Sequence, residues 1–93
     1  MKLVNSLAWR IKFSDEAVKS LSKLDKHVAK QVYRAIQQLA ALENPRDKGK
    51  ALTGQLRGLW RYRIGDYRVV CLIEDDELIV LVLGVGHRRQ IYG

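Results

Sequence analysis

The chain has 93 residues, and its 17 Lys and Arg outnumber its 10 Asp and Glu to give a formal net charge of +7. Hydrophobic residues make up 47% and charged residues 29%, which predicts one folded domain and excludes a disordered or linker-rich chain. A single cysteine, Cys71, excludes an internal disulfide.

Neither a secretory signal nor an apolar run long enough to cross a bilayer is found in the sequence, so we expect a cytoplasmic protein without membrane partners. The positive charge favours an anionic partner, either a nucleic acid or an acidic protein. Net charge alone leaves a merely soluble basic protein equally open.

The first half of the chain predicts a strand and two helices. Residues 9–13, "WRIKF", alternate apolar and basic side chains, as in a half-buried strand. Ser14 and Asp25 are the expected N-caps of the two helices, and "ENP" at 43–45 ends the second one. Their apolar stripes are Ala17, Val18, Leu21 and Leu24 in the first helix, and Val28, Val32, Ala35, Ile36, Leu39 and Leu42 in the second.

The second half predicts a basic connection, residues 46–58, followed by three strands. We expect these strands at 59–64, 67–74 and 77–86, with two-residue joints at 65–66 and 75–76. Joints of this length make antiparallel hairpins. The predicted fold class is therefore α+β, in the order β-α-α-β-β-β, with a helix hairpin packed on one face of an antiparallel sheet. The position of the first strand within the sheet stays open.

Three arginines are predicted to share one face of this sheet. A two-residue joint pairs Ile64 with Tyr67 and Arg63 with Arg68. Because side chains alternate along a strand, Arg61 then lies on the same face as Arg63 and Arg68. Like charges directly opposite each other are unfavourable by roughly 0.2–1 kcal/mol. The trio therefore favours a site for a polyanion over a solvated basic surface.

The same face is predicted to carry apolar residues, which are Val70, Leu72, Ile79, Leu81 and Leu83. Residues 1–8 or the connection 46–58 can cover them, and a partner protein can do the same. We name Val70, Leu72, Ile79 and Leu81 as the expected docking surface, with cover by the chain itself equally open.

The sequence ends in "VGHRRQIYG", a second cluster of candidate site residues. Gly84 and Gly86 allow the last strand to bend, so that Arg88 and Tyr92 can reach the sheet arginines. His87 could accept a proton near pH 7. The "EDDE" run at 74–77 predicts a solvated turn. With neither metal-ligand spacing nor a phosphate loop or dinucleotide motif in the sequence, we expect no metal and no cofactor.

Taken together, these motifs resemble the RelE branch of the RelE/ParE toxin superfamily. The most specific stretches are "L.G...G.WRYRIGDYRV", which begins at Leu52, and the ending "VGHRR..Y". The opening "IKFSDEAVKSLSKLD" also fits, so the resemblance predicts a single RelE-like domain over residues 1–93, with 1–8 an unassigned extension. Two departures are arginine at a basic pair where some relatives have lysine, and the lack of an extra C-terminal helix after Tyr92.

The resemblance implies a toxin of a type II toxin–antitoxin system. Such a toxin is a ribosome-dependent endoribonuclease that cleaves mRNA in the A site without a metal, by attack of the 2′-hydroxyl on phosphate. Its implied partners are a RelB-like antitoxin, the ribosome and mRNA, with operator DNA reached only through the antitoxin complex. The implied catalytic residues are Arg68, Arg88, Tyr92 and His87, and the implied phosphate-binding residues are Arg61, Arg63, Lys50 and Arg57.

Two rival hypotheses remain at this point. A ParE-like inhibitor of DNA gyrase would have the same fold and no nuclease activity, but its relatives generally lack the strand arginines together with the terminal Arg and Tyr. A basic module that only sequesters nucleic acid, or acts as a DNA-binding corepressor, is the second rival.

Overall fold

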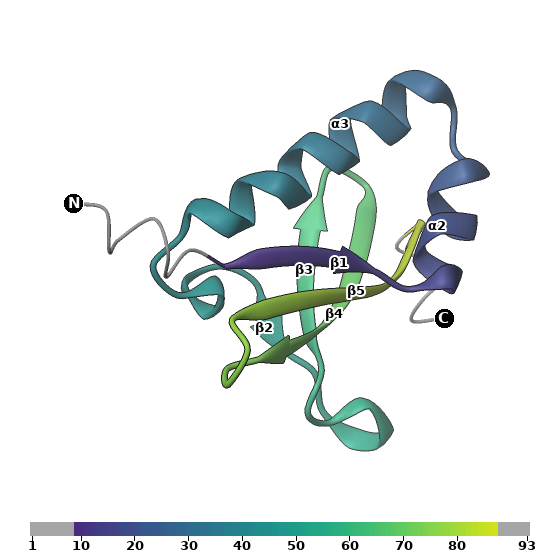
Figure 1. The fold of residues 1–93 in the computed structure, drawn as a ribbon. Helices are drawn as coiled ribbons and strands as arrows, with labels where there is room; N and C mark the ends of the chain where they lie inside the picture. The colour runs from purple at the N-terminus through teal and green to yellow at the C-terminus, as the bar shows by residue number, and fades with distance from the viewer. Residues whose placement is uncertain (1–8, 88–93) are drawn as a thin grey trace.

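The structure, a computed structural model, describes residues 9–87. Two helices pack on one face of a five-stranded sheet (Figure 1), which confirms the α+β prediction. The described part of the chain contains no helix that is long and apolar enough to span a membrane. The helices and strands are β1 (Arg10–Phe13), α2 (Asp15–Ser22), α3 (Lys26–Gln38), β2 (Lys50–Ala51), β3 (Trp60–Ile64), β4 (Tyr67–Glu74) and β5 (Ile79–His87), with short 3-10 turns η1 (Leu39–Ala41), η2 (Pro45–Asp47) and η3 (Gly54–Leu56).

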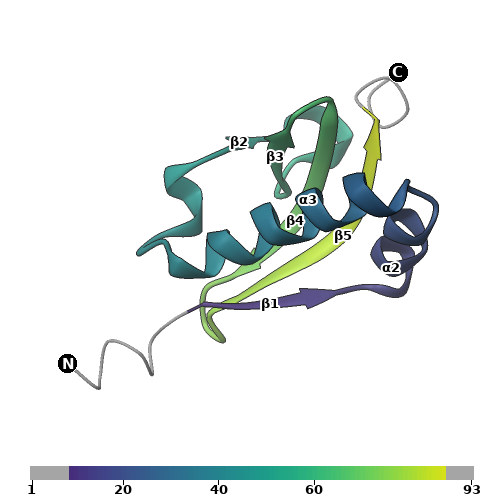
Figure 2. The same cartoon turned by 90° about the horizontal axis from the view of Figure 1, so that it is seen from above.

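Both helices begin where the sequence predicts. The Ser14 hydroxyl accepts a hydrogen bond from the Ala17 backbone N–H at 3.1 Å, and the Asp25 carboxylate accepts one from the His27 N–H at 3.1 Å. Seen from above, α3 crosses over the sheet and α2 lies near the end of β1 (Figure 2). The prediction for the apolar stripe of the first helix is wrong at one residue: Val18 is 55% exposed, whereas Ala17 is fully buried. Successive helical residues are rotated by about 100°, which turns Val18 away from the sheet.

The strand order is β1-β5-β4-β3-β2. The last three strands form antiparallel hairpins as predicted, but β1 pairs with β5 in parallel, so the sheet is mixed. A parallel pair needs a long connection and leaves no turn signal in the sequence, which is why this edge was not predicted. The predicted connection 46–58 supplies β2, which pairs with β3 and extends the opposite edge.

The two predicted hairpin joints have different outcomes. The first is confirmed, because Ile64 pairs with Tyr67 and Gly65 has a φ of 59°. The second is wrong: Glu74 pairs with Ile79, so the joint spans residues 75–78 and β5 begins later than predicted. A two-residue turn favours glycine at its centre, and Asp75-Asp76 offers none. The chain turns through Leu78 instead, at a φ of 56°.

A β-bulge in β5 changes which side chains face the helices. Val70 pairs with Gly84 while Cys71 pairs with Val82, so Leu83 is the extra residue of the bulge. The Ser14 hydroxyl donates a hydrogen bond to the Leu83 carbonyl oxygen at 3.1 Å and links the bulge to the start of α2. Each side chain after Leu83 therefore points to the opposite face from the one that strict alternation along β5 predicts.

The core lies between the helices and the sheet. Its buried residues are Trp9, Ala17, Val32, Ile36, Leu39, Tyr62, Val69, Cys71, Val80, Val82 and Val85. The free thiol of Cys71 is fully buried, as predicted, and burial raises its pKa to about 12. A thiol in this state stays protonated at neutral pH and has a structural role.

Candidate functional site

Basic side chains from three neighbouring strands lie on the sheet face that carries no helix. Arg63 pairs with Arg68 across β3 and β4, as the sequence predicts. Lys50 of β2 pairs with Arg61 of β3, which places Lys50 on the same face. Adjacent strands are about 4.8 Å apart, so these four cations come from a band of sheet about 10 Å wide. We call Lys50, Arg61, Arg63 and Arg68 the basic cluster.

A hollow of about 250 Å³ lies within this cluster. Of the described residues, Gly49, Lys50, Arg61 and Arg63 line it, and every charged side chain among them is basic. Gly49 has a φ of +82°, and a Cβ at this position would lie 2.6 Å from Trp60 Nε1 and would overlap the Arg61 carbonyl oxygen. Only glycine therefore lets the chain approach β3 so closely. Gly49 is not among the predicted site residues, and its one signal in the sequence is a glycine between two lysines, "KGK".

The segment that carries Lys50 is fixed to β3 by two hydrogen bonds. We call residues 45–50 the strap. The buried Tyr62 hydroxyl donates to the Pro45 carbonyl oxygen at 2.7 Å, and Trp60 Nε1 donates to the Lys48 carbonyl oxygen at 2.7 Å. Burial raises the pKa of Tyr62, which keeps the phenol protonated as a donor. The strap therefore holds one wall of the hollow in place before any ligand binds.

An ion pair fixes the other end of the strap to the β4–β5 turn. Both terminal nitrogens of Arg46 donate to the carboxylate oxygens of Asp75, each at 2.8 Å. This hydrogen bonding lowers the pKa of Asp75 and raises that of Arg46. No group of His, Cys, Asp or Glu within residues 9–87 is arranged to hold a metal ion.

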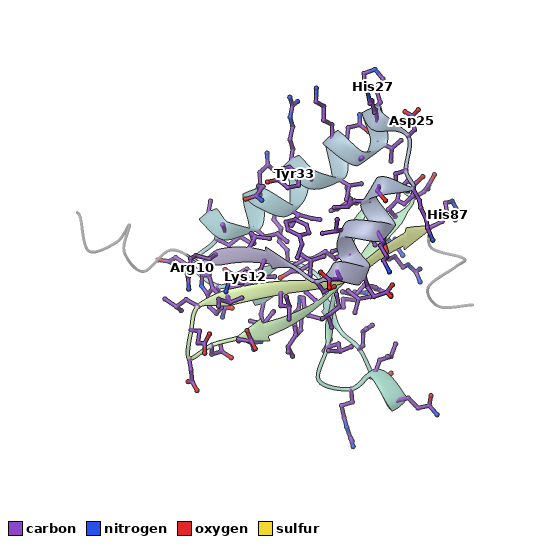
Figure 3. All side chains as sticks on the ribbon, turned by 45° about the vertical axis from the view of Figure 1, so that its right-hand side comes forward. Arg10, Lys12, Asp25, His27, Tyr33 and His87 are labelled. Carbon is purple, nitrogen blue, oxygen red and sulfur yellow. The ribbon has the colours of Figure 1, made fainter. Side chains whose placement is uncertain are left out.

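His87 lies on the opposite face of the sheet from the basic cluster. Its cross-strand partner is Tyr67, and the two rings meet edge to face with centroids 5.7 Å apart. Together with Lys19 and Lys23 of α2, His87 lines a separate hollow on the helix side, and Figure 3 shows its position at the end of β5. Strict alternation along β5 would place His87 beside the arginines, but the bulge at Leu83 reverses its direction.

The other predicted site residues either lie apart from the hollow or fall outside the described residues. Arg57 is exposed at the end of η3 and is not among the described residues that line the hollow. Arg88 and Tyr92, predicted to complete the site, lie outside the described residues. The structure thus brings together the four strand and strap cations but separates His87 and Arg57 from them.

The predicted docking surface is smaller than the sequence indicates. Val70 is 9% exposed and Ile79 only 2%, so they offer little surface to a partner, whereas Leu72 and Leu81 are half-buried. Parallel pairing adds two cations that sequence analysis did not place there. Arg10 pairs with Ile79 and Lys12 with Leu81, so both side chains border this apolar band, and Figure 3 shows them on β1.

The chemistry of the basic cluster is that of an anion site. Each guanidinium offers a planar fork of donors and a permanent charge, which suits the non-bridging oxygens of a phosphodiester. The same donors stabilise the extra negative charge that develops during attack on phosphorus. Arginine is a poor proton carrier, so the described cluster can bind and polarise a phosphate without itself supplying a base.

Comparisons with known proteins identify relatives of this chain. The family model described as "ParE toxin of type II toxin-antitoxin system, parDE" matches residues 11–92. The curated toxin RelG of Mycobacterium tuberculosis is 31% identical over 87 residues, which cover 92% of this chain and 98% of RelG.

Solved structures agree with these sequence matches. The toxin–antitoxin complex RelBE2 of Mycobacterium tuberculosis contains a chain that is 30% identical, with a TM-score of 0.78 and coverage of 87% of this chain and 92% of that one. The archaeal RelE–RelB complex of Pyrococcus horikoshii gives a TM-score of 0.68 at 26% identity, covering 89% and 98%. On this sequence and structural similarity, the chain belongs to the RelE/ParE superfamily and is a toxin of a type II toxin–antitoxin system.

Proposed function

We propose that this toxin is a ribosome-dependent endoribonuclease that cleaves mRNA in the A site and thereby stops translation in the cytoplasm. The observation that carries the proposal is the basic cluster, in which Arg61, Arg63 and Arg68 share one face with Lys50. Three of its members line a hollow that has no acidic side chain among its described lining residues. Mutual repulsion of three adjacent guanidinium groups destabilises the sheet, so their clustering favours a strongly anionic ligand, and the phosphates of RNA suit their planar donors.

In the proposed reaction, the 2′-hydroxyl of one nucleotide attacks the phosphorus that links it to the next. A bond forms between O2′ and phosphorus, and the bond between phosphorus and O5′ breaks. The products are a 2′,3′-cyclic phosphate and a free 5′-hydroxyl. The 2′-hydroxyl loses a proton and the leaving O5′ gains one, and we propose that side chains carry out both transfers without a metal or cofactor.

The cluster has a defined part in this scheme. Arg61 and Arg63 bind the non-bridging oxygens, and Arg68, which pairs with Arg63, stabilises the charge of the transition state. Arg88 and Tyr92 are proposed to act at the leaving oxygen and in proton transfer. His87 has no role in this scheme, because it lies on the sheet face opposite the basic cluster.

Dependence on the ribosome follows from this chemistry. Without a strong general base among its arginines, the site is expected to act slowly on free RNA. Correct orientation of the reacting groups is worth about 7–11 kcal/mol in favourable cases. The ribosome can supply this term by holding the mRNA extended in the A site.

The proposed protein partner is a RelB-like antitoxin. Two solved relatives are complexes of a RelE toxin with its antitoxin. Here the half-buried Leu72 and Leu81 lie beside the cations Arg10 and Lys12, a combination that suits an acidic segment with apolar anchors. Contact with operator DNA is proposed to occur only through this antitoxin complex.

Removal of single arginines tests the nuclease. Arg61→Ala and Arg68→Ala should each lower the rate of mRNA cleavage on purified ribosomes by about 10²–10³-fold, since each removes a donor to the developing charge. Arg34→Ala, on an exposed position of α3, removes the same charge from the helix side and should leave the rate unchanged. Primer extension that maps the new 5′ ends, with circular dichroism as a check on folding, measures both effects.

The alternative is inhibition of DNA gyrase, which the description of the matching family model keeps open. Trapped gyrase–DNA complexes together with intact mRNA would replace the nuclease proposal. Equal cleavage rates for the wild type and Arg68→Ala would remove the assigned role of the basic cluster.

A further inference from the structure

Gly84 lies in line with the basic cluster on the same face of the sheet. Lys50 pairs with Arg61, Arg61 with Val70, and Val70 with Gly84, so these four residues form one row across β2, β3, β4 and β5. Cross-strand partners point to the same face. The bulge at Leu83 sets the register in which Gly84 takes this place.

Nothing within the described chain requires a glycine at this position. Gly84 is not among the glycines with positive φ, which are Gly49, Gly54, Gly58 and Gly65. Among the described residues, no heavy atom lies within 4 Å of a Cβ built on Gly84, so a side chain would fit into open space there. Glycine in a strand interior weakens the strand relative to alanine, and it often marks a place where a ligand approaches the backbone.

The row has the dimensions of a nucleotide. Two strand spacings separate β3 from β5, so Gly84 lies about 10 Å from Arg61 across the sheet. A phosphate bound by Arg61 leaves its ribose and base to extend over β4 and β5. Val70 between them is 9% exposed, so its neighbours cover most of it. At Gly84 there is no side chain, and no heavy atom of the described chain lies within 4 Å of an added Cβ. The open space in this row is therefore at Gly84, where a flat ring can reach the backbone.

We propose that Gly84 is the floor of a nucleoside subsite, on which the ribose and base adjoining the scissile phosphate lie against the bare backbone of β5. The inference rests on the proposed function, because it takes RNA as the substrate of the cluster. A protein partner would gain more from apolar side chains to pack against, such as Leu72 and Leu81 in the same sheet, than from an absent one. Gly84 is thus a positioning residue that works by leaving space.

Graded substitution separates this role from a structural one. Gly84→Ala should lower the rate of mRNA cleavage on ribosomes by about 10-fold and Gly84→Val by about 100-fold, because small displacements of a reacting group are that costly. Both variants should melt at or above the wild-type temperature, since the added side chain meets open space and suits a strand. Ala51→Val adds bulk at an exposed strand position facing away from the cluster and should leave cleavage unchanged.

A binding measurement on the full chain makes the subsite testable without catalysis. Titration with a 2′-O-methyl RNA trinucleotide, which cannot be cleaved, should shift the amide NMR signals of Gly84 and Val70 together with that of Arg61. In Gly84→Val the Arg61 shift should persist while the affinity falls.

The outcomes separate the two proposals. Wild-type rates in Gly84→Val overturn the subsite and leave the nuclease standing. Absence of cleavage by the wild type itself sinks the nuclease, and the titration then decides the subsite, which fails if only Arg61 responds. Loss of antitoxin binding with unchanged cleavage in Gly84→Val would also overturn it, by assigning this surface to the antitoxin.

Discussion

Gly49 and Gly84 are both glycines of the candidate site, and their reasons for being glycine are opposite. Gly49 is required by the chain itself, because its φ is +82° and a Cβ would overlap the Arg61 carbonyl oxygen. Gly84 is not among the glycines with positive φ, and an added Cβ would have no heavy atom of the described chain within 4 Å. Stability measurements should therefore distinguish the two positions, even though both lie beside the arginines.

Gly49→Ala is expected to be strongly destabilising. A left-handed conformation costs an L-residue about 1–2 kcal/mol, and forcing atoms into a packed contact adds about 1–3 kcal/mol. Gly54→Ala is the matched control, with a φ of +66° and no heavy atom within 4 Å of the added Cβ. It should lose only the first of these two contributions. Urea unfolding of the purified variants measures the difference, and equal losses would contradict the close approach of the strap to β3.

The strap illustrates how a short segment becomes part of a site. Its residues form only one 3-10 turn and the beginning of a two-residue strand, so its position depends on bonds to its neighbours. Tyr62 and Trp60 of β3 bind its carbonyl oxygens, and Arg46 binds Asp75 of the β4–β5 turn. These bonds hold Lys50 beside Arg61 and reduce the entropy that must be lost when a phosphate binds.

The ion pair of the strap predicts a pH dependence. Because Arg46 lowers the pKa of Asp75 in the folded state, the pair stabilises the fold above the pKa of an unfolded carboxyl, about 3.9. This stabilisation is lost as the pH falls through the lower, folded pKa. The wild type should thus melt at a higher temperature than Asp75→Asn at pH ~7, and the gap should close in acid. Asp76→Asn, on the same turn, is the control, and a gap that persists in strong acid would contradict the assignment.

The elements that the sequence predicts are those whose signals are local. Capping by Ser14 and Asp25 and the Gly65-Asp66 joint each depend on residues that are neighbours in sequence, and the structure confirms all three. The parallel pairing of β1 and the short β2 depend on distant strands, and neither has a local signature.

The candidate site, too, could be predicted from the sequence only where local signals determine the position of its residues. A confirmed hairpin register was enough to place Arg61, Arg63 and Arg68 on one face. His87 was misplaced because a single extra residue, Leu83, reverses the alternation of β5. Gly84 and Gly86 indicated an irregular strand, but the position of the extra residue is set by packing against α2 and by the Ser14 hydrogen bond.

At the scale of the whole molecule, the two faces of the sheet differ in what they carry. The helix side contains the core, while the other side carries the basic cluster, with Arg10 and Lys12 on the far edge. With a net charge of +7, the protein is expected to approach RNA and the ribosome rapidly at low ionic strength.

Salt should weaken RNA binding, and the slope of this dependence should report the number of phosphates that the protein contacts. The logarithm of the affinity falls linearly with the logarithm of salt concentration, by about 0.7 per contacted phosphate of a single strand. Arg61→Ala and Arg68→Ala should each reduce this slope by about 0.7, whereas Arg34→Ala should leave it unchanged. Fluorescence anisotropy with a labelled 2′-O-methyl RNA across a salt series measures the slopes, and identical slopes in all variants would exclude phosphate contact by the cluster.

The parallel pairing of β1 with β5 has a consequence for how the toxin comes into being. Within the described chain, β1 is the first strand to be synthesised and β5 the last, yet they are neighbours in the sheet. Contacts between segments so far apart in sequence form slowly, because the entropy of loop closure must be lost first, and β4 likewise has no neighbour on this side until β5 is present. A nascent chain therefore cannot complete the five-stranded sheet before β5 has been synthesised. The sheet order makes β1, the first described strand to be synthesised, wait for the last one before it is paired.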